Sequence, residues 1–183
     1  MESVREFFVH ELGDMLDAER KILDVLQQQQ EEVQNPQLQK AFEMHYSQTE
    51  KQIERIEQVF QELEEQAEET ECKGIMGLIE EKQAFMQEDP SEELVELFTI
   101  GATAKVEHYE IAAYNTLIDL ATKLGINKGV RLLNQNLREE EQMLKKAEGF
   151  AKKMKPENLG MEEEEEGEEE EARPRSRSRR RAA

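Results

Sequence analysis

Four long stretches of the chain repeat apolar residues every three or four positions, which is the spacing of one face of an α-helix. The first follows Ser3 and Glu6, the arrangement of a capping box, and the second begins at Pro36, which suits the first position of a helix. The pattern therefore predicts four long helices, over residues 4–33, 36–68, 91–124 and 127–155.

Two tight turns and one long connection join these helices. Asn35-Pro36 separates the first pair, and Gly125, suited to a left-handed helix end, separates the last pair, with Asn127 as the next cap. Between residues 70 and 90 a short apolar piece flanked by glycines predicts a small helix within the connection.

This order of elements predicts an all-α fold. Two antiparallel hairpins joined by a crossover with a short helix form the topology of a ferritin-like four-helix bundle, as opposed to a simple up-and-down bundle. We expect the bundle to span residues 1–160. A helical bundle with an unstructured middle loop is the alternative.

Residues 161–183 have a different composition, nine Glu followed by six Arg, with almost nothing to bury. We expect a disordered tail that makes at most weak, salt-sensitive contact with nucleic acid or an anionic surface. The whole chain carries a net charge of −19, which argues against nucleic-acid binding by the rest of it.

Two further sequence features bear on the metal chemistry and on the location of the protein. A single cysteine, Cys72, excludes an internal disulfide and a cysteine-rich metal site. No apolar run approaches the roughly 20 residues needed to span a bilayer, and the N-terminus lacks the apolar stretch of a signal peptide. We therefore expect a cytoplasmic protein.

Polar residues interrupt the apolar stripes where the core should lie. Glu19 falls in the first stripe, Glu107 and Glu110 in the third, and Glu140 in the fourth. A buried carboxylate must be neutralised, paired or bound to a cation. The second helix presents three polar residues on its apolar face: His45, Thr49 and Gln52.

These residues also share a level in the bundle. Glu19 and Thr49 stand about equally far from the first hairpin turn, as do Glu110 and Glu140 from the second, at ~1.5 Å per residue. Carboxylates and an imidazole converging inside a four-helix bundle are typical of sites that bind two iron or two manganese ions. Glu107, one turn from Glu110, would bridge or bind the second ion.

Other roles are open for several of these groups. An acidic chain places some Glu near any helical face by chance, and their long side chains can reach outward to water. His45 fits a core histidine as well as a ligand, and Tyr109 and Tyr114 fit core aromatics or hydrogen-bond donors to the site. Surface positions are expected for four more residues: His10, His108, Glu139 and Glu141.

Four stretches of the sequence together form a family pattern: LGDMLDAERKIL (12–23), AFEMHYSQTEKQIERIEQVF (41–60), KVEHYEIAAYNTLIDLATKLG (105–125) and LLNQNLREEE (132–141). Over about residues 4–155 the chain resembles the YciF/YciE family of bacterial ferritin-like stress proteins. The resemblance implies a ferritin-like bundle, a homodimer, a two-metal centre related to that of rubrerythrin, and a role in stress. Glu19, Glu107, Glu110 and Glu140 match acidic positions of the family.

One position departs from the family pattern. Gln48-Thr49 stands where members resembling YciF carry Glu-Thr, and this chain has no Glu-x-x-His pair. An asymmetric centre, a single ion and a bundle without metal all remain open.

The function we predict is a ferritin-like stress protein with iron or manganese in a carboxylate-rich core, handling iron or reducing oxygen or peroxide. The metal ligands we expect are Glu19, Glu110 and Glu140, with Glu107 as a bridging or second-metal ligand and with His45 and Gln52 as weaker candidates. The alternative is a non-enzymatic bundle that acts as a stress or scaffold protein through protein interactions.

Overall fold

The computed structural model describes residues 1–154, which form five helices and no strand. The four long helices of the prediction are present, and the short helix between the second and third is confirmed. The helices are α1 (Val4–Glu32), α2 (Pro36–Glu62), α3 (Lys73–Met86), α4 (Glu92–Lys123) and α5 (Asn127–Ala151).

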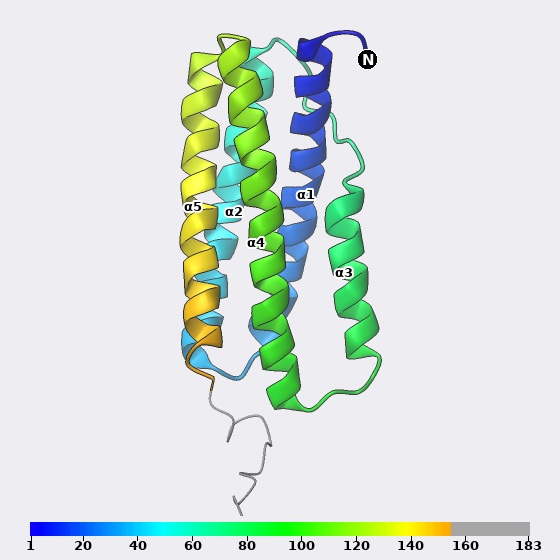
Figure 1. Ribbon diagram of the computed structural model, residues 1–183, viewed down its shortest axis with the longest axis vertical. Coiled ribbons are helices and arrows are strands. Elements are labelled where there is room, and N and C mark those ends of the chain that lie inside the picture. Colours follow the sequence, from blue (N-terminus) through cyan, green and yellow to red (C-terminus); the bar gives the residue numbers. More distant parts are fainter. Residues whose placement is uncertain (155–183) are drawn as a thin grey trace, which may run out of the picture.

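The four long helices form a bundle of two hairpins, α1–α2 and α4–α5 (Figure 1). Within the bundle α2 also packs against α5 and α1 against α4, which closes the ring of four. The connection between the hairpins runs along the bundle, and α3 within it lies outside the ring against α4 and α1 (Figure 1). The predicted all-α fold with a helical crossover is therefore confirmed.

Several predicted helix ends are also confirmed by their local chemistry. The Ser3 hydroxyl accepts a hydrogen bond from the Glu6 N–H, and the Asn35 side chain accepts from the N–H groups at the start of α2. Gly125 adopts φ +74°, the left-handed conformation that glycine tolerates best, and so reverses the chain between α4 and α5.

Three predicted boundaries are wrong. Helix α2 ends at Glu62 and not near residue 68, because Glu64 adopts φ 57° and turns the chain out of the helix. Helix α5 ends at Ala151, and Asn127 is its first residue and not its cap, which is Ile126. The expected bundle boundary at 160 and the tail at 161–183 lie outside the described residues.

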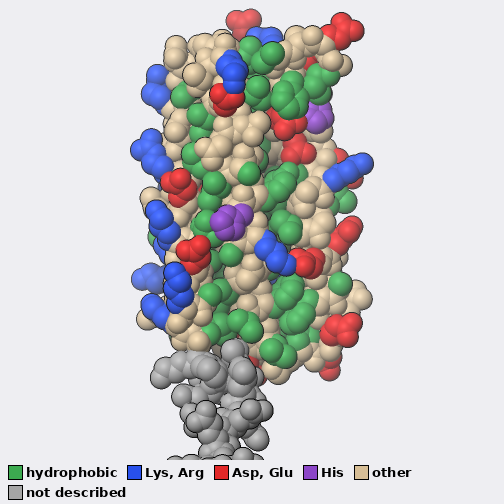
Figure 2. Space-filling model, in the orientation of Figure 1, with side chains coloured by type: hydrophobic (Ala, Val, Ile, Leu, Met, Phe, Trp, Pro, Cys, Tyr) green, Lys and Arg blue, Asp and Glu red, His purple; other side chains and the backbone are tan. Residues whose placement is uncertain are grey.

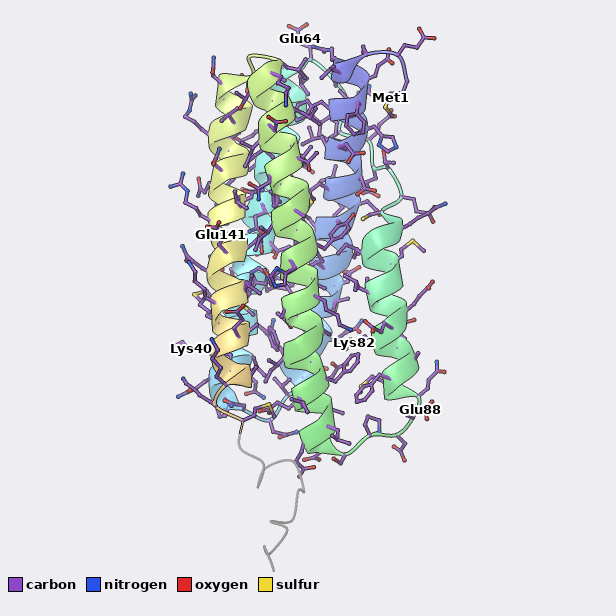
Figure 3. All side chains as sticks on the ribbon, viewed as in Figure 1. Met1, Lys40, Glu64, Lys82, Glu88 and Glu141 are labelled. Carbon is purple, nitrogen blue, oxygen red and sulfur yellow. The ribbon has the colours of Figure 1, made fainter. Side chains whose placement is uncertain are left out.

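The crossover is held against the bundle by close packing and ion pairs. A Cβ added to Gly74 would lie 2.5 Å from the Tyr109 ring of α4. Lys82 of α3, labelled in Figure 3, lies 2.6 Å from a Glu32 carboxylate oxygen, and the Phe85 ring stacks on Phe98 at 4.0 Å between centroids. Helix α3 is thus a packed part of the molecule.

Candidate metal centre

Every carboxylate predicted to face the core is buried there. Glu19 on α1, Glu107 and Glu110 on α4 and Glu140 on α5 are at most 1% exposed, as is His45 on α2. The four long helices therefore all contribute a side chain to the same interior region. Each side chain lies on the stripe that its sequence spacing indicated.

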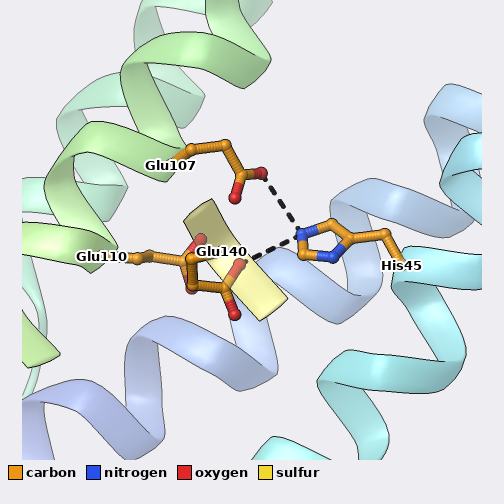
Figure 4. A group of neighbouring side chains, drawn as sticks. All are labelled: His45, Glu107, Glu110 and Glu140. Carbon is orange, nitrogen blue, oxygen red and sulfur yellow. Dashed lines mark ion pairs between the residues drawn. The ribbon is translucent and has the colours of Figure 1, made fainter. Parts of the chain in front are cut away.

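Four of the five side chains meet at one point. His45, Glu107, Glu110 and Glu140 each offer a ligand atom, and these atoms all lie within 4.8 Å of one another (Figure 4). The His45 Nε2 atom lies 3.2 Å from Glu107 Oε1 and 3.5 Å from Glu140 Oε2. We call these four residues the His–Glu cluster.

The His–Glu cluster contains polar atoms without a hydrogen-bond partner. The Oε2 atoms of Glu107, Glu110 and Glu140 have none, and neither do the two ring nitrogens of His45. Buried polar groups in proteins nearly always have partners, so several orphans at one point need an explanation. Carboxylate oxygens with an imidazole nitrogen form a donor set that suits iron or manganese, so these residues fit such an ion.

Glu19 is held slightly apart from the His–Glu cluster. The Tyr114 hydroxyl donates a hydrogen bond to Glu19 Oε1, and in turn accepts one from Asn136 Nδ2 at 2.9 Å. Glu19 Oε2 has no partner. Tyr114 is therefore both a core aromatic and a hydrogen-bond donor to the site, because it is fully buried and donates to a candidate ligand.

A second polar network supports Glu140 from the side of α2. Gln52 Nε2 donates to Glu140 Oε1, and also to Glu139 Oε2 at 3.2 Å. Arg55 donates to both Glu139 oxygens, at 2.7 and 3.1 Å, and to Asn136 Oδ1 at 2.9 Å. Through these bonds one cation neutralises the acidic residue beside Glu140.

Sequence reasoning missed Arg55 and Asn136. Arg55 follows Gln52 by three residues on the same face of α2, and that spacing was the available signal. Glu139, expected at the surface, is half-buried in this network. The other expected surface residues, Glu141 (labelled in Figure 3), His10 and His108, are exposed.

Burial shifts the acid–base properties of the whole site. It raises the pKa of Glu107 to about 8, and it raises the pKa of Glu110 and Glu19, where the charge of Glu140 adds to the effect. Burial likewise raises the pKa of Glu140 and lowers the pKa of His45. The cluster favours neutral groups unless a cation compensates the carboxylates.

Comparison with known proteins agrees with this architecture. Residues 3–160 match the family model described as "Domain of unknown function (DUF892)". Protein YciF of Escherichia coli strain K12 is 37% identical over 142 residues, which cover 77% of this chain and 86% of YciF. The chain belongs to the YciF family.

Solved structures extend the comparison to three dimensions. The crystal structure of the E. coli stress protein YciF superposes with a TM-score of 0.79 at 33% identity, covering 88% of this chain and all of that one. YcfI of Rhodopseudomonas palustris gives a TM-score of 0.78 at 34% identity, covering 80% and 94% of the two chains. These two solved structures are thus similar to this chain in overall fold.

Among residues 1–154, no helix combines the length and the apolar character that a membrane crossing would need.

Proposed function

We propose that this YciF-family protein binds one Fe(II) or Mn(II) ion at the His–Glu cluster and serves in the cellular response to stress. The proposal rests on one observation: three carboxylates and an imidazole converge in a fully buried place with unpartnered ligand atoms. A cation there would relieve both the unmet hydrogen-bonding capacity and the mutual repulsion of the carboxylates.

Each protein group has a definable part. Glu107, Glu110 and Glu140 supply negative charge, and His45 supplies a neutral nitrogen, because its lowered pKa keeps the ring unprotonated. Gln52 fixes the orientation of Glu140 by donating to its Oε1 atom. A bound ferrous or manganous ion would supply one electron at a time toward the reduction of dioxygen or peroxide.

Two features favour a single tightly held ion over a pair. Tyr114 already occupies one oxygen of Glu19, and α2 presents the amide Gln52, not a carboxylate, opposite Glu140. Amide oxygens are weaker ligands for hard cations than carboxylates are. Glu19 and Gln52 therefore mark a second position with lower affinity, which makes the centre asymmetric.

The test is metal analysis combined with a matched pair of variants. Protein purified without chelator should contain about one iron or manganese ion per chain, because the four cluster residues make one complete donor set. Glu110→Ala should weaken Mn(II) binding in a calorimetric titration by more than about 100-fold, since even outer-shell partners change affinity 10–100-fold. Glu141→Ala, exposed on the same bundle, is the control and should leave the affinity unchanged.

Two results would contradict the proposal. Equal losses from both substitutions would mean that the acidic surface holds the ion. No metal even after reconstitution would favour the alternative, a non-enzymatic bundle that works through protein interactions.

We also propose that the protein is a cytoplasmic homodimer. Helix α4 supports this, because Leu94 and Leu97 lie exposed near its start, and apolar side chains that lie together on a surface mark interaction sites. Hydrophobic side chains run down the face viewed in Figure 2 between the charged groups, so apolar surface is available to a second copy.

A further inference from the structure

A small apolar cavity lies between α1, α3 and α4, beside the His–Glu cluster. Its volume is about 30 Å³, and its walls are formed mainly by aliphatic side chains, among them Ile22 and Leu26 of α1, Ile75 and Ile79 of α3 and Val106 of α4. The short crossover helix thus supplies one wall of an internal space next to the ring of four long helices.

The cavity and the candidate metal centre share a residue. Glu107 lines the cavity and is also a member of the His–Glu cluster, where its Oε2 atom has no hydrogen-bond partner. A molecule in the cavity would therefore lie next to a candidate ligand of the metal ion. Of the other wall residues, Val25, Ile79 and Val106 keep some contact with solvent, so the cavity is reachable from outside the bundle.

The volume of the cavity and the chemistry of its walls indicate which small molecule it can bind. One water needs roughly 10–15 Å³, so a molecule of two heavy atoms fits. Water and hydrogen peroxide need several polar partners, and the wall offers few. Its polar residues are Gln29, Thr103 and Glu107, and the Thr103 hydroxyl proton is already donated to the Thr99 carbonyl at 2.9 Å. Dioxygen needs no hydrogen bond, and apolar cavities that stay dry take up apolar gases.

We propose that this cavity binds dioxygen and holds it against Glu107 at the metal centre. The dioxygen role rests on the proposed function, and it makes dioxygen, not peroxide, the oxidant that this site admits. The cavity itself depends only on packing. Its α3 wall is held in place by the Lys82–Glu32 pair and by Lys105, which lies 2.7 Å from both Glu81 oxygens.

Xenon tests the cavity without any metal. Crystals of the metal-free protein pressurised with xenon should show one xenon atom among Ile22, Ile75 and Val106. Val25→Phe should fill the space from α1 and abolish the xenon site, whereas Val130→Phe, a half-buried valine of α5 away from the cavity, should leave it. Should Val25→Phe fail to fold by circular dichroism, Ile79→Phe blocks the same space from α3. A wild-type cavity without xenon would overturn the proposal.

The oxidant is tested on protein loaded with Fe(II). The blocking variant should slow oxidation of Fe(II) by dissolved dioxygen severalfold, with Val130→Phe oxidising at the wild-type rate. Oxidation by added hydrogen peroxide should be equal in all three proteins, and the affinity for Mn(II) should not change. Slowing of both oxidants together, or of neither, would overturn the assignment to dioxygen.

The two experiments separate the two proposals. Xenon in the cavity of a protein that binds no iron or manganese would overturn the proposed function and the delivery role with it. Tight metal binding without a xenon site would overturn only the cavity proposal.

Discussion

Four carboxyl groups in one bundle core are costly to ionise, because burial favours their protonated form. The pKa of Glu107 is raised from 4.5 to about 8. Its protonated form therefore adds fully to the free energy of unfolding below pH 4.5, and this stabilisation is lost as the pH rises through 8. His45 acts in the opposite sense, since its pKa is lowered from 6.5 and its contribution is lost as the pH falls below that value. Between about pH 6.5 and 8 the carboxyl effect alone remains.

We therefore expect the metal-free protein to melt at a lower temperature at pH 8 than at pH 6.5. Glu110→Gln should reduce this dependence, and the exposed Glu141→Gln should not. Saturating Mn(II) should reverse the trend, because the ligands must lose protons to bind the ion. Melting curves by circular dichroism at several pH values provide the measurement, and a flat profile without metal would contradict the expected protonation of the site.

A substitution at Gln52 tests how many ions the centre binds. The Gln52 amide donates to Glu140 beside the second, weaker ion position that we propose, so Gln52→Glu should raise the Mn(II) stoichiometry from about one toward two. Without metal the same variant should be less stable than wild type, because it adds another buried acid beside Glu140. Gln58→Glu, half-buried on the same helix, is the control and should bind one ion. Unchanged stoichiometry in Gln52→Glu would mean that this position does not serve a second ion.

The sequence was informative about which residues face the core and less so about their partners. A period of 3.6 residues places Glu19, His45 and Glu140 inside whatever their rotamers are, and all three are buried. Which oxygen meets which donor depends on side-chain torsions and on the distances between helices. For that reason the Tyr114 bond to Glu19 and the Arg55 bonds to Glu139 could not be read from spacing.

At the level of helices, chain reversals that use strong turn residues were predictable. The Asn35-Pro36 and Gly125 signals coincide with the two hairpin turns. The end of α2 could not be predicted in this way, because Glu64 adopts a positive φ although it is not a glycine. This end is capped by Arg5, which donates to the Leu63 carbonyl at 2.6 Å. A contact between residues this far apart in the chain leaves no local trace in the sequence.

Two glycines of α3 differ only in what surrounds them. A Cβ at Gly74 would lie 2.5 Å from the Tyr109 ring, whereas one at Gly77 would meet nothing within 4 Å. Gly74→Ala should therefore lower the free energy of unfolding by about 1–3 kcal/mol, as overpacking does. Gly77→Ala should raise it by roughly 0.5–1 kcal/mol through its helix propensity. Urea denaturation measures both, and a stabilised Gly74→Ala variant would show that α3 does not dock closely on α4.

At the scale of the whole molecule, we expect a dimer because apolar side chains are exposed on the outer surface of α4. Leu94 and Leu97 are 43% and 37% exposed near the start of α4. We expect sedimentation velocity to show a dimer, and Leu97→Glu to shift it toward monomer by placing a charge in the interface. Met44→Glu, an exposed apolar position on α2, should remain dimeric. A wild-type protein that sediments as a monomer at all concentrations would contradict this.

The crossover also has a consequence for how the molecule assembles and opens. Contacts within the α1–α2 and α4–α5 hairpins are close in sequence, so each hairpin can form early, and α3 can dock only after the two have come together. An element that docks last on an existing surface is also released most readily, without global unfolding. Amide hydrogens of α3 should therefore exchange with deuterium faster than those at the centres of α1 and α4, as read by mass spectrometry of peptides. Each such opening would widen the way to Ile22 and Glu107, so the entry of larger molecules would depend on the local stability of the fourteen residues of α3 and not on that of the bundle.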